Sequence, residues 1–160
     1  MVRAELQYEL FSVFSLLMET PLLMGILNVT PDSFSDGGRY FSPLEAVEKG
    51  RSLMGDGADL IDIGGESTRP GAARPSLEEE LGRVIPVIET LAKEFPKKIS
   101  VDTRRYEVAL AAAEVGAFII NDVSAGSDIR MADVVKKFHL NIILMHMQGE
   151  PGMMQLDPSY

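Results

Sequence analysis

The chain passes abruptly from apolar residues to polar and turn-forming ones in the stretch Gly25-Ile-Leu-Asn-Val-Thr-Pro-Asp-Ser-Phe-Ser-Asp-Gly-Gly38. The apolar run at its start, residues 22–27, stops at the amide Asn28. This pattern predicts a buried strand that continues into a surface loop. Because binding and catalytic groups concentrate on loops that a rigid scaffold holds in place, we expect part of a functional site here.

The same alternation continues along the rest of the chain. The apolar runs cover residues 22–27, 60–63, 99–101, 118–120 and 142–145, and the amphipathic stretches between them cover 43–56, 76–95, 105–115 and 130–138. Alternating strands and helices predict a parallel sheet with crossover helices, and runs that are apolar throughout indicate strands covered on both faces. A (β/α)₈ barrel and a doubly wound sheet both fit. The missing G-x-G-x-x-G motif after the first strand disfavours the dinucleotide-binding form of the latter.

Local signals mark the expected helix ends. Ser76 followed by Glu79 predicts a capping box, and Ser42 before Pro43 predicts a capped helix start. Two glycines are expected to stop helices at their carboxyl ends, namely Gly57 and Gly116. Five strands and four helices are fewer than a complete barrel of about 250 residues needs. We therefore expect an α/β fold of the (β/α)₈ TIM-barrel type, truncated to about five strands and four helices over residues 21–160, with residues 1–20 as an extension that covers the barrel base.

Composition narrows the classes of function. The 160 residues include 15 basic and 24 acidic side chains, for a net charge of −9, which argues against nucleic acid or an anionic membrane as a partner. There is no cysteine, so the chain lacks disulfides and a thiolate nucleophile and fits a cytoplasmic location. The apolar segment at residues 10–18 is too short to span a bilayer and does not resemble a signal peptide.

Each expected strand is followed by polar residues. The groups that close the five runs are Asn28, Gly64-Gly65-Glu66, Asp102-Thr103-Arg104, Asn121-Asp122 and His146. Because the carboxyl ends of parallel strands lie on one side of a barrel, we expect these groups to form a polar site that reads a nitrogen heterocycle. Two structural alternatives stay open. The asparagines could satisfy backbone groups in turns, and Asp102 could cap the helix that follows it.

Taken together, these segments resemble dihydropteroate synthases of folate biosynthesis. The matching segments are Met24-Gly-Ile-Leu-Asn-Val-Thr-Pro-Asp-Ser-Phe-Ser-Asp-Gly-Gly38, Asp62-Ile-Gly-Gly-Glu-Ser-Thr-Arg-Pro-Gly71, Ser100-Val-Asp-Thr103, Ile120-Asn-Asp-Val-Ser124 and Leu144-Met-His-Met-Gln-Gly149. They follow the family's order and spacing from residue 22 onward. The resemblance implies a (β/α)₈ barrel and a transferase that joins 6-hydroxymethyl-7,8-dihydropterin diphosphate to 4-aminobenzoate, releases diphosphate, and is a sulfonamide target.

The resemblance also implies roles for individual residues. Asn28 is expected to hold the Mg²⁺ cofactor and the diphosphate, and Thr68 to bind the pterin diphosphate. Asp102 and Asn121 are expected to read the pterin edge, while Met145 packs on its ring.

Four more roles fall in the two long loops. Phe34 and Pro70 are expected to border the 4-aminobenzoate site, with Arg69 nearby. Asp36 is expected to stabilise the cationic pterin carbon, which makes Asp36 and Asp102 the candidate catalytic residues.

The family pattern extends beyond residue 160, into segments that supply further pterin contacts and the cationic groups that grip diphosphate. We therefore expect this chain alone to have little or no synthase activity, and either a missing carboxyl-terminal half or a homo-oligomer as its partner. Two alternatives remain: a non-catalytic pterin-binding or assembly module, and a pterin-dependent methyltransferase domain. The segments Asp32-Ser-Phe-Ser-Asp36 and Ser67-Thr-Arg-Pro70 speak against the methyltransferase.

Overall fold

The computed structural model describes residues 21–30, 42–66 and 74–146. Strands and helices alternate throughout this part of the chain, as the sequence predicts. In order they are β1 (Met24–Asn28), α2 (Pro43–Gly55), β2 (Leu60–Gly64), α3 (Leu77–Glu94), β3 (Ile99–Asp102), α4 (Tyr106–Glu114), β4 (Ile119–Asp122), α5 (Arg130–Phe138) and β5 (Asn141–Leu144). Every helix among them is too short or too polar to cross a bilayer. The extension expected at residues 1–20 lies outside the described residues.

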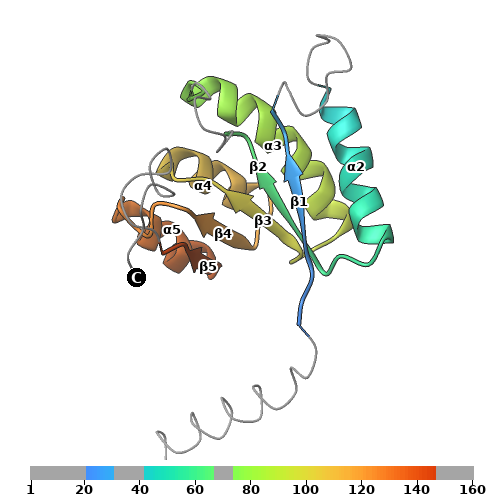
Figure 1. The fold of residues 1–160 in the computed structure, drawn as a ribbon. Helices are drawn as coiled ribbons and strands as arrows, with labels where there is room; N and C mark the ends of the chain where they lie inside the picture. Colours follow the sequence, from blue (N-terminus) through green and yellow to red (C-terminus); the bar gives the residue numbers. More distant parts are fainter. Residues whose placement is uncertain (1–20, 31–41, 67–73, 147–160) are drawn as a thin grey trace, which may run out of the picture.

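The five strands form one parallel sheet in the order β1-β2-β3-β4-β5 (Figure 1). Each of β2 to β5 therefore pairs with the strand that precedes it along the chain. A doubly wound sheet reverses its strand order at a switch point, whereas a (β/α)₈ barrel adds every strand on the same side. The observed order thus agrees with the expected barrel type, of which this part of the chain supplies five strands.

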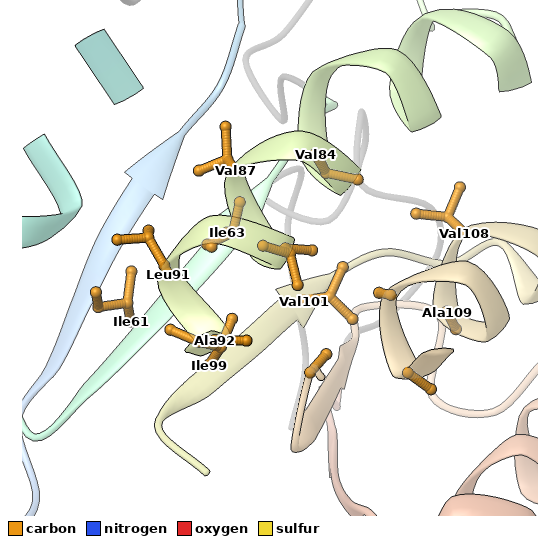
Figure 2. Close-up of a cluster of buried hydrophobic side chains, with 14 of the residues drawn as sticks. Ile61, Ile63, Val84, Val87, Leu91, Ala92, Ile99, Val101, Val108 and Ala109 are labelled. Carbon is orange, nitrogen blue, oxygen red and sulfur yellow. The ribbon is translucent and has the colours of Figure 1, made fainter. Parts of the chain in front are cut away.

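The hydrophobic core lies between the sheet and the helices. Leu27, Ile63, Val101 and Ile120 occupy one register row across β1 to β4, and all four are buried. They pack in one cluster with apolar residues of the helices, several of which Figure 2 shows around β2 and β3. The helix residues labelled there are Val84, Val87, Leu91, Ala92, Val108 and Ala109.

The opposite face of the sheet is called the inner face. It carries Ile26 and Asn28 of β1, Asp62 and Gly64 of β2, Ser100 and Asp102 of β3, Ile119 and Asn121 of β4, and Asn141 and Ile143 of β5. The expected burial of both faces holds well in the middle of the sheet, where Asp62 and Ser100 are 3% and 0% exposed. It is wrong at the two edges, because Ile26 of β1 and every residue of β5 are exposed.

The helix ends follow most of the local signals. Ser76 accepts a hydrogen bond from the Glu79 backbone N–H, and the Glu79 carboxylate accepts one from the Ser76 N–H, which completes the predicted capping box of α3. Gly57 and Gly116 follow the ends of α2 and α4 with φ values of 103° and 111°. Ser42 differs from expectation, because it occupies the N-cap of α2 but its side chain makes no capping hydrogen bond.

This difference between two serine caps gives a matched test. Ser76→Ala is expected to lower the free energy of unfolding by about 1 kcal/mol, because the Glu79 backbone N–H loses the hydroxyl oxygen that accepts its hydrogen bond. Ser42→Ala removes a hydroxyl that caps nothing and is expected to have little effect. Urea unfolding followed by circular dichroism measures both changes. Equal losses in the two variants would show that the capping box does not stabilise α3.

Candidate functional site

Polar side chains line up at the carboxyl ends of β1, β3 and β4. The register pairs Asn28 with Gly64, Gly64 with Asp102, and Asp102 with Asn121. Residues in one register row of a parallel sheet point to the same face. Asn28, Asp102 and Asn121 therefore share the inner face, opposite the helices, and the sheet brings them together as the sequence predicts.

Gly64, which lies in the same register row, leaves space for the Asp102 carboxylate. A Cβ atom added to Gly64 would lie 3.3 Å from Asp102 Oδ2 and 3.4 Å from Asp102 Cβ. The Asp102 side chain thus fills the space that a side chain at this position of β2 would take, which directs its carboxylate toward the β1 side of the row.

Asp102 is partly buried and surrounded by other acidic groups. Burial, which is the largest cause, and the nearby carboxylates of Asp62, Glu66, Glu80 and Asp122 together raise its pKa from the ordinary value of 3.8 to about 7. Within the described ranges, no hydrogen bond satisfies the Asp102 carboxylate. Near neutral pH this group can therefore either donate or accept a hydrogen bond from a ligand.

The helix-capping alternative for Asp102 is wrong. Helix α4 has Arg105 at its N-cap, and the Thr103 hydroxyl accepts a hydrogen bond of 3.1 Å from the Arg105 N–H. Thr103 also donates a hydrogen bond of 2.7 Å to Glu80, so its hydroxyl acts both as a donor and as an acceptor. The Asp102 side chain therefore does not cap α4.

The Asn121 side chain bonds to another side chain, whereas the turn alternative expects it to bond to backbone groups. Its Nδ2 donates a hydrogen bond of 2.8 Å to Oδ2 of Asp62. Asp62 belongs to a matching segment of the sequence, but sequence reasoning assigned it no role in the site. The available signal was a charged residue inside the apolar run at residues 60–63. Because side chains alternate between the two faces along β2, Asp62 lies on the same face as Asn28, Asp102 and Asn121, which are called the polar row.

Met145 lies just beyond β5. Its backbone N–H donates a hydrogen bond of 3.2 Å to the carbonyl oxygen of Asp122, and its side chain is partly buried. Ile143, two residues earlier, is the register partner of Asn121. The alternation of side chains along a strand therefore puts Met145 on the inner face next to the polar row.

The other predicted site residues cannot be placed. Phe34, Asp36, Thr68, Arg69 and Pro70 lie outside the described residues. Across residues 21–30, 42–66 and 74–146, no cluster of three or more histidine or acidic residues is arranged to hold a metal ion. Asn28 is exposed at the carboxyl end of β1, so its amide oxygen can reach a ligand.

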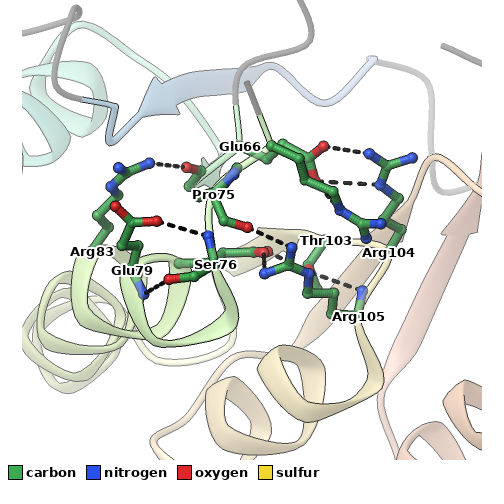
Figure 3. A network of polar contacts seen from close by, with 11 residues as sticks. Glu66, Pro75, Ser76, Glu79, Arg83, Thr103, Arg104 and Arg105 are labelled. Carbon is green, nitrogen blue, oxygen red and sulfur yellow. Dashed lines mark hydrogen bonds and ion pairs between the residues drawn. The ribbon is translucent and has the colours of Figure 1, made fainter. Parts of the chain in front are cut away.

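Buried polar contacts brace the backbone beside the row (Figure 3). The Glu80 carboxylate is 1% exposed and accepts the Thr103 hydroxyl on one oxygen, while Arg105 Nη1 lies 3.1 Å from the other. Arg105 Nη2 donates a hydrogen bond of 2.6 Å to the carbonyl oxygen of Pro75. One arginine therefore connects α3, the start of α4 and the backbone that leads into α3.

A second group of contacts holds the end of β2 (Figure 3). Glu66 forms an ion pair with Arg104 and a longer one, of 3.7 Å, with Arg74. Arg83 of α3 donates a hydrogen bond of 3.0 Å to the carbonyl oxygen of Gly65. A Cβ atom added to Gly65 would lie 2.8 Å from Val84 Cγ1, so glycine is required for this close approach. Together the two groups fix the backbone on both sides of residues 67–73.

Comparisons with known proteins agree with this arrangement. The chain is 52% identical over 146 residues to dihydropteroate synthase of Escherichia coli K12, a match that covers 91% of this chain and 52% of that protein. Dihydropteroate synthase of Xanthomonas albilineans, solved with 4-aminobenzoic acid, superposes with a TM-score of 0.75 at 52% identity and covers 82% of this chain and 48% of its own. The Burkholderia cenocepacia enzyme, solved with 7,8-dihydropteroate, gives 0.73 at 41% identity, with coverages of 89% and 48%.

The chain spans about half the length of the curated relatives it matches. The family model described as pterin binding enzyme matches residues 24–160, which include all five strands and the whole polar row of the inner face. On this evidence the chain belongs to the pterin binding enzyme family.

Proposed function

We propose that this chain forms the pterin-binding part of a dihydropteroate synthase, which joins 6-hydroxymethyl-7,8-dihydropterin diphosphate to 4-aminobenzoate. The observation that carries the proposal is the polar row Asn28, Asp102 and Asn121 on one face, at the carboxyl ends of parallel strands where barrel active sites form. High identity to dihydropteroate synthases supports it.

Asp102 and Asn121 are the groups suited to the pterin edge. A carboxyl group and an amide side by side offer both donors and acceptors to a ring that carries N–H groups and ring nitrogens. Asp102 has no competing hydrogen bond among the described residues, so a ligand does not have to displace one. Met145 is available to pack on the flat ring through its polarisable thioether.

Asn28 fits a role in holding Mg²⁺ with the diphosphate. Its exposed amide supplies the hard oxygen ligand that this ion prefers, and Mg²⁺ usually keeps several waters and takes phosphate oxygens as well, so a cluster of acidic residues is not required. When bound, the ion would neutralise the leaving diphosphate. Thr68 is proposed to bind the same pterin diphosphate.

The remaining chemistry needs no protein nucleophile. The carbon–oxygen bond to diphosphate breaks, the pterin delocalises the resulting positive charge, and the aniline nitrogen forms the new carbon–nitrogen bond and loses a proton. Fixed carboxylates close to that charge lower the barrier by preorganised electrostatics, and Asp36 and Asp102 are proposed for this role. Phe34, Arg69 and Pro70 are proposed to surround 4-aminobenzoate.

A titration of the chain with 6-hydroxymethyl-7,8-dihydropterin diphosphate and Mg²⁺ tests the proposal. We expect Asn121→Ala to weaken binding by about tenfold, as the loss of one ligand hydrogen bond requires. Asn141→Ala is the matched control, because Asn141 is an exposed asparagine of the same inner face at the opposite end of its strand.

Equal affinities in the two variants, or binding that is absent from the unmodified chain, would contradict the proposal for this site. Adding 4-aminobenzoate to the same samples and measuring diphosphate release then separates a synthase from a module that binds pterin without turnover.

A further inference from the structure

Asp62 lies underneath the polar row rather than in it. It belongs to β2, while its partner Asn121 belongs to β4, and β3 lies between the two strands. In register Asp62 is level with Ser100, whereas Asn121 is level with Asp102. The hydrogen bond between Asp62 and Asn121 therefore crosses over β3, one level below the ligand-facing end of the row.

Asp62 is a buried carboxylate and not a surface one. The residue is 3% exposed, and its second oxygen, Oδ1, has no hydrogen-bond partner among the residues that the structure describes. The hydroxyl of Ser100, its register neighbour, is also fully buried and has no partner within the described ranges. Buried polar atoms without partners are rare and costly, so a carboxylate kept here requires an explanation.

The chemistry of the two side chains supplies that explanation. An amide can turn either its oxygen or its nitrogen toward a neighbour, and only the hydrogen-bond network decides between them. A carboxylate accepts hydrogen bonds and does not donate them. Asn121 must therefore turn its Nδ2 toward Asp62, which leaves its Oδ1 and one N–H for a ligand.

We propose that Asp62 is a positioning residue that fixes the orientation of the Asn121 amide and so determines which heterocycle edges the site accepts. This inference rests on the proposed function, because it assigns the bound ring to the same inner face. A ring that offers an N–H to the Asn121 oxygen is accepted, and a ring that offers a bare nitrogen there is rejected. Asp62 itself does not touch the ligand.

The first arm of the test needs no ligand. In ¹⁵N–¹H spectra of the complete chain, the Nδ2 protons of Asn121 are assigned by their loss in Asn121→Asp. We expect the Asn121 Nδ2 proton that is hydrogen-bonded to the Asp62 carboxylate to be shifted well downfield, and the shift to be much smaller in Asp62→Asn, because a neutral amide oxygen is a weaker acceptor than a carboxylate. Ser100→Ala is the matched control, because it removes an equally buried polar atom of the same face that has no hydrogen bond in the described part of the chain. An unchanged Asn121 signal in Asp62→Asn would overturn the proposal.

The second arm separates orientation from simple structural support. Asp62→Asn combined with Asn121→Asp exchanges the two side chains and keeps a hydrogen bond of the same type between them. We expect this double variant to regain the unfolding midpoint of the unmodified chain, yet to bind 6-hydroxymethyl-7,8-dihydropterin diphosphate with Mg²⁺ at least tenfold more weakly. Recovery of both properties would show that only the bond matters and would overturn the proposal.

The two arms distinguish this inference from the function on which it rests. If the unmodified chain does not bind the pterin diphosphate, the proposed function fails, and the amide signal alone still decides whether Asp62 orients Asn121. If the pterin binds and the amide signal does not depend on Asp62, the proposed function stands and the positioning role is refuted.

Discussion

Arg105→Ala is expected to lower the free energy of unfolding by about 3–5 kcal/mol, because it leaves the buried Glu80 carboxylate without its charged partner. Glu80 is 1% exposed, and the Arg105 side chain is 15% exposed, so water cannot replace the lost contact well. The same substitution removes the hydrogen bond to the Pro75 carbonyl oxygen. A loss of this size is a large part of the 5–15 kcal/mol that usually stabilises a domain.

Urea unfolding of the variants measures the effect, and two controls define its cause. Arg51→Ala removes an arginine that also pairs with a glutamate, Glu94, but these side chains are 40% and 34% exposed, so water can replace the contact and little change is expected. Arg105→Ala combined with Glu80→Gln removes the uncompensated charge and is expected to recover part of the stability. If the Arg51 and Arg105 variants lost equal stability, burial would not be what makes the Arg105 contact important.

The fold was largely predictable because its signals are local. Apolar runs, capping residues and glycines such as Gly57 and Gly116 each act over a few neighbouring residues, and together they predicted every strand and helix in the described part of the chain. The order of the strands is not local. The expected order followed from the resemblance to a barrel family, and the structure agrees with it, because β2 to β5 each pair with the preceding strand.

The candidate site was predictable only in part, for a different physical reason. Asn28, Asp102 and Asn121 close apolar runs, so their shared position at the sheet edge follows from topology. Asp62 lies inside an apolar run, where its neighbours hide it, and its bond to Asn121 crosses an intervening strand. Such a contact between strands that are not adjacent has no signature at any fixed sequence spacing.

Sequence alone also could not show which side chain, Asp102 or Thr103, accepts the hydrogen bond at the start of α4. Asp102 and Thr103 are adjacent, and both can accept a hydrogen bond from the start of a helix. Sequence alone could not decide between them. The structure does, because the Thr103 hydroxyl accepts from the Arg105 N–H and the Asp102 side chain lies over Gly64 instead.

Asp102→Asn is expected to weaken binding of 6-hydroxymethyl-7,8-dihydropterin diphosphate by about a hundredfold, because it replaces an acceptor that can carry charge at the centre of the polar row. A titration of the chain with the pterin diphosphate and Mg²⁺ measures the loss. Asp56→Asn is the control, since Asp56 is an exposed carboxylate at the C-cap of α2, near the opposite end of the sheet. Unchanged affinity in the Asp102 variant would remove this residue from the site.

The same substitution is expected to stabilise the unliganded protein, and the effect depends on pH. The pKa of Asp102 is raised from 3.8 to about 7 by burial and by neighbouring carboxylates, so the folded protein holds a proton that the unfolded chain releases. This contribution to stability is fully present below pH 3.8 and is lost as the pH rises through about 7. A shift of this size corresponds to a cost of up to about 4 kcal/mol at pH 8.

Asparagine has no charge to lose, so the stability gained by Asp102→Asn should grow steadily from acid to neutral pH and level off above pH 7. Urea unfolding of both proteins between pH 4.5 and 8 measures this difference directly, because all other titrating groups are shared and largely cancel. A constant difference across the range would show that Asp102 titrates normally in the folded state. Opposite effects on stability and binding in one variant are the mark of a carboxylate kept for its ligand, since a residue kept for structure would lose both together.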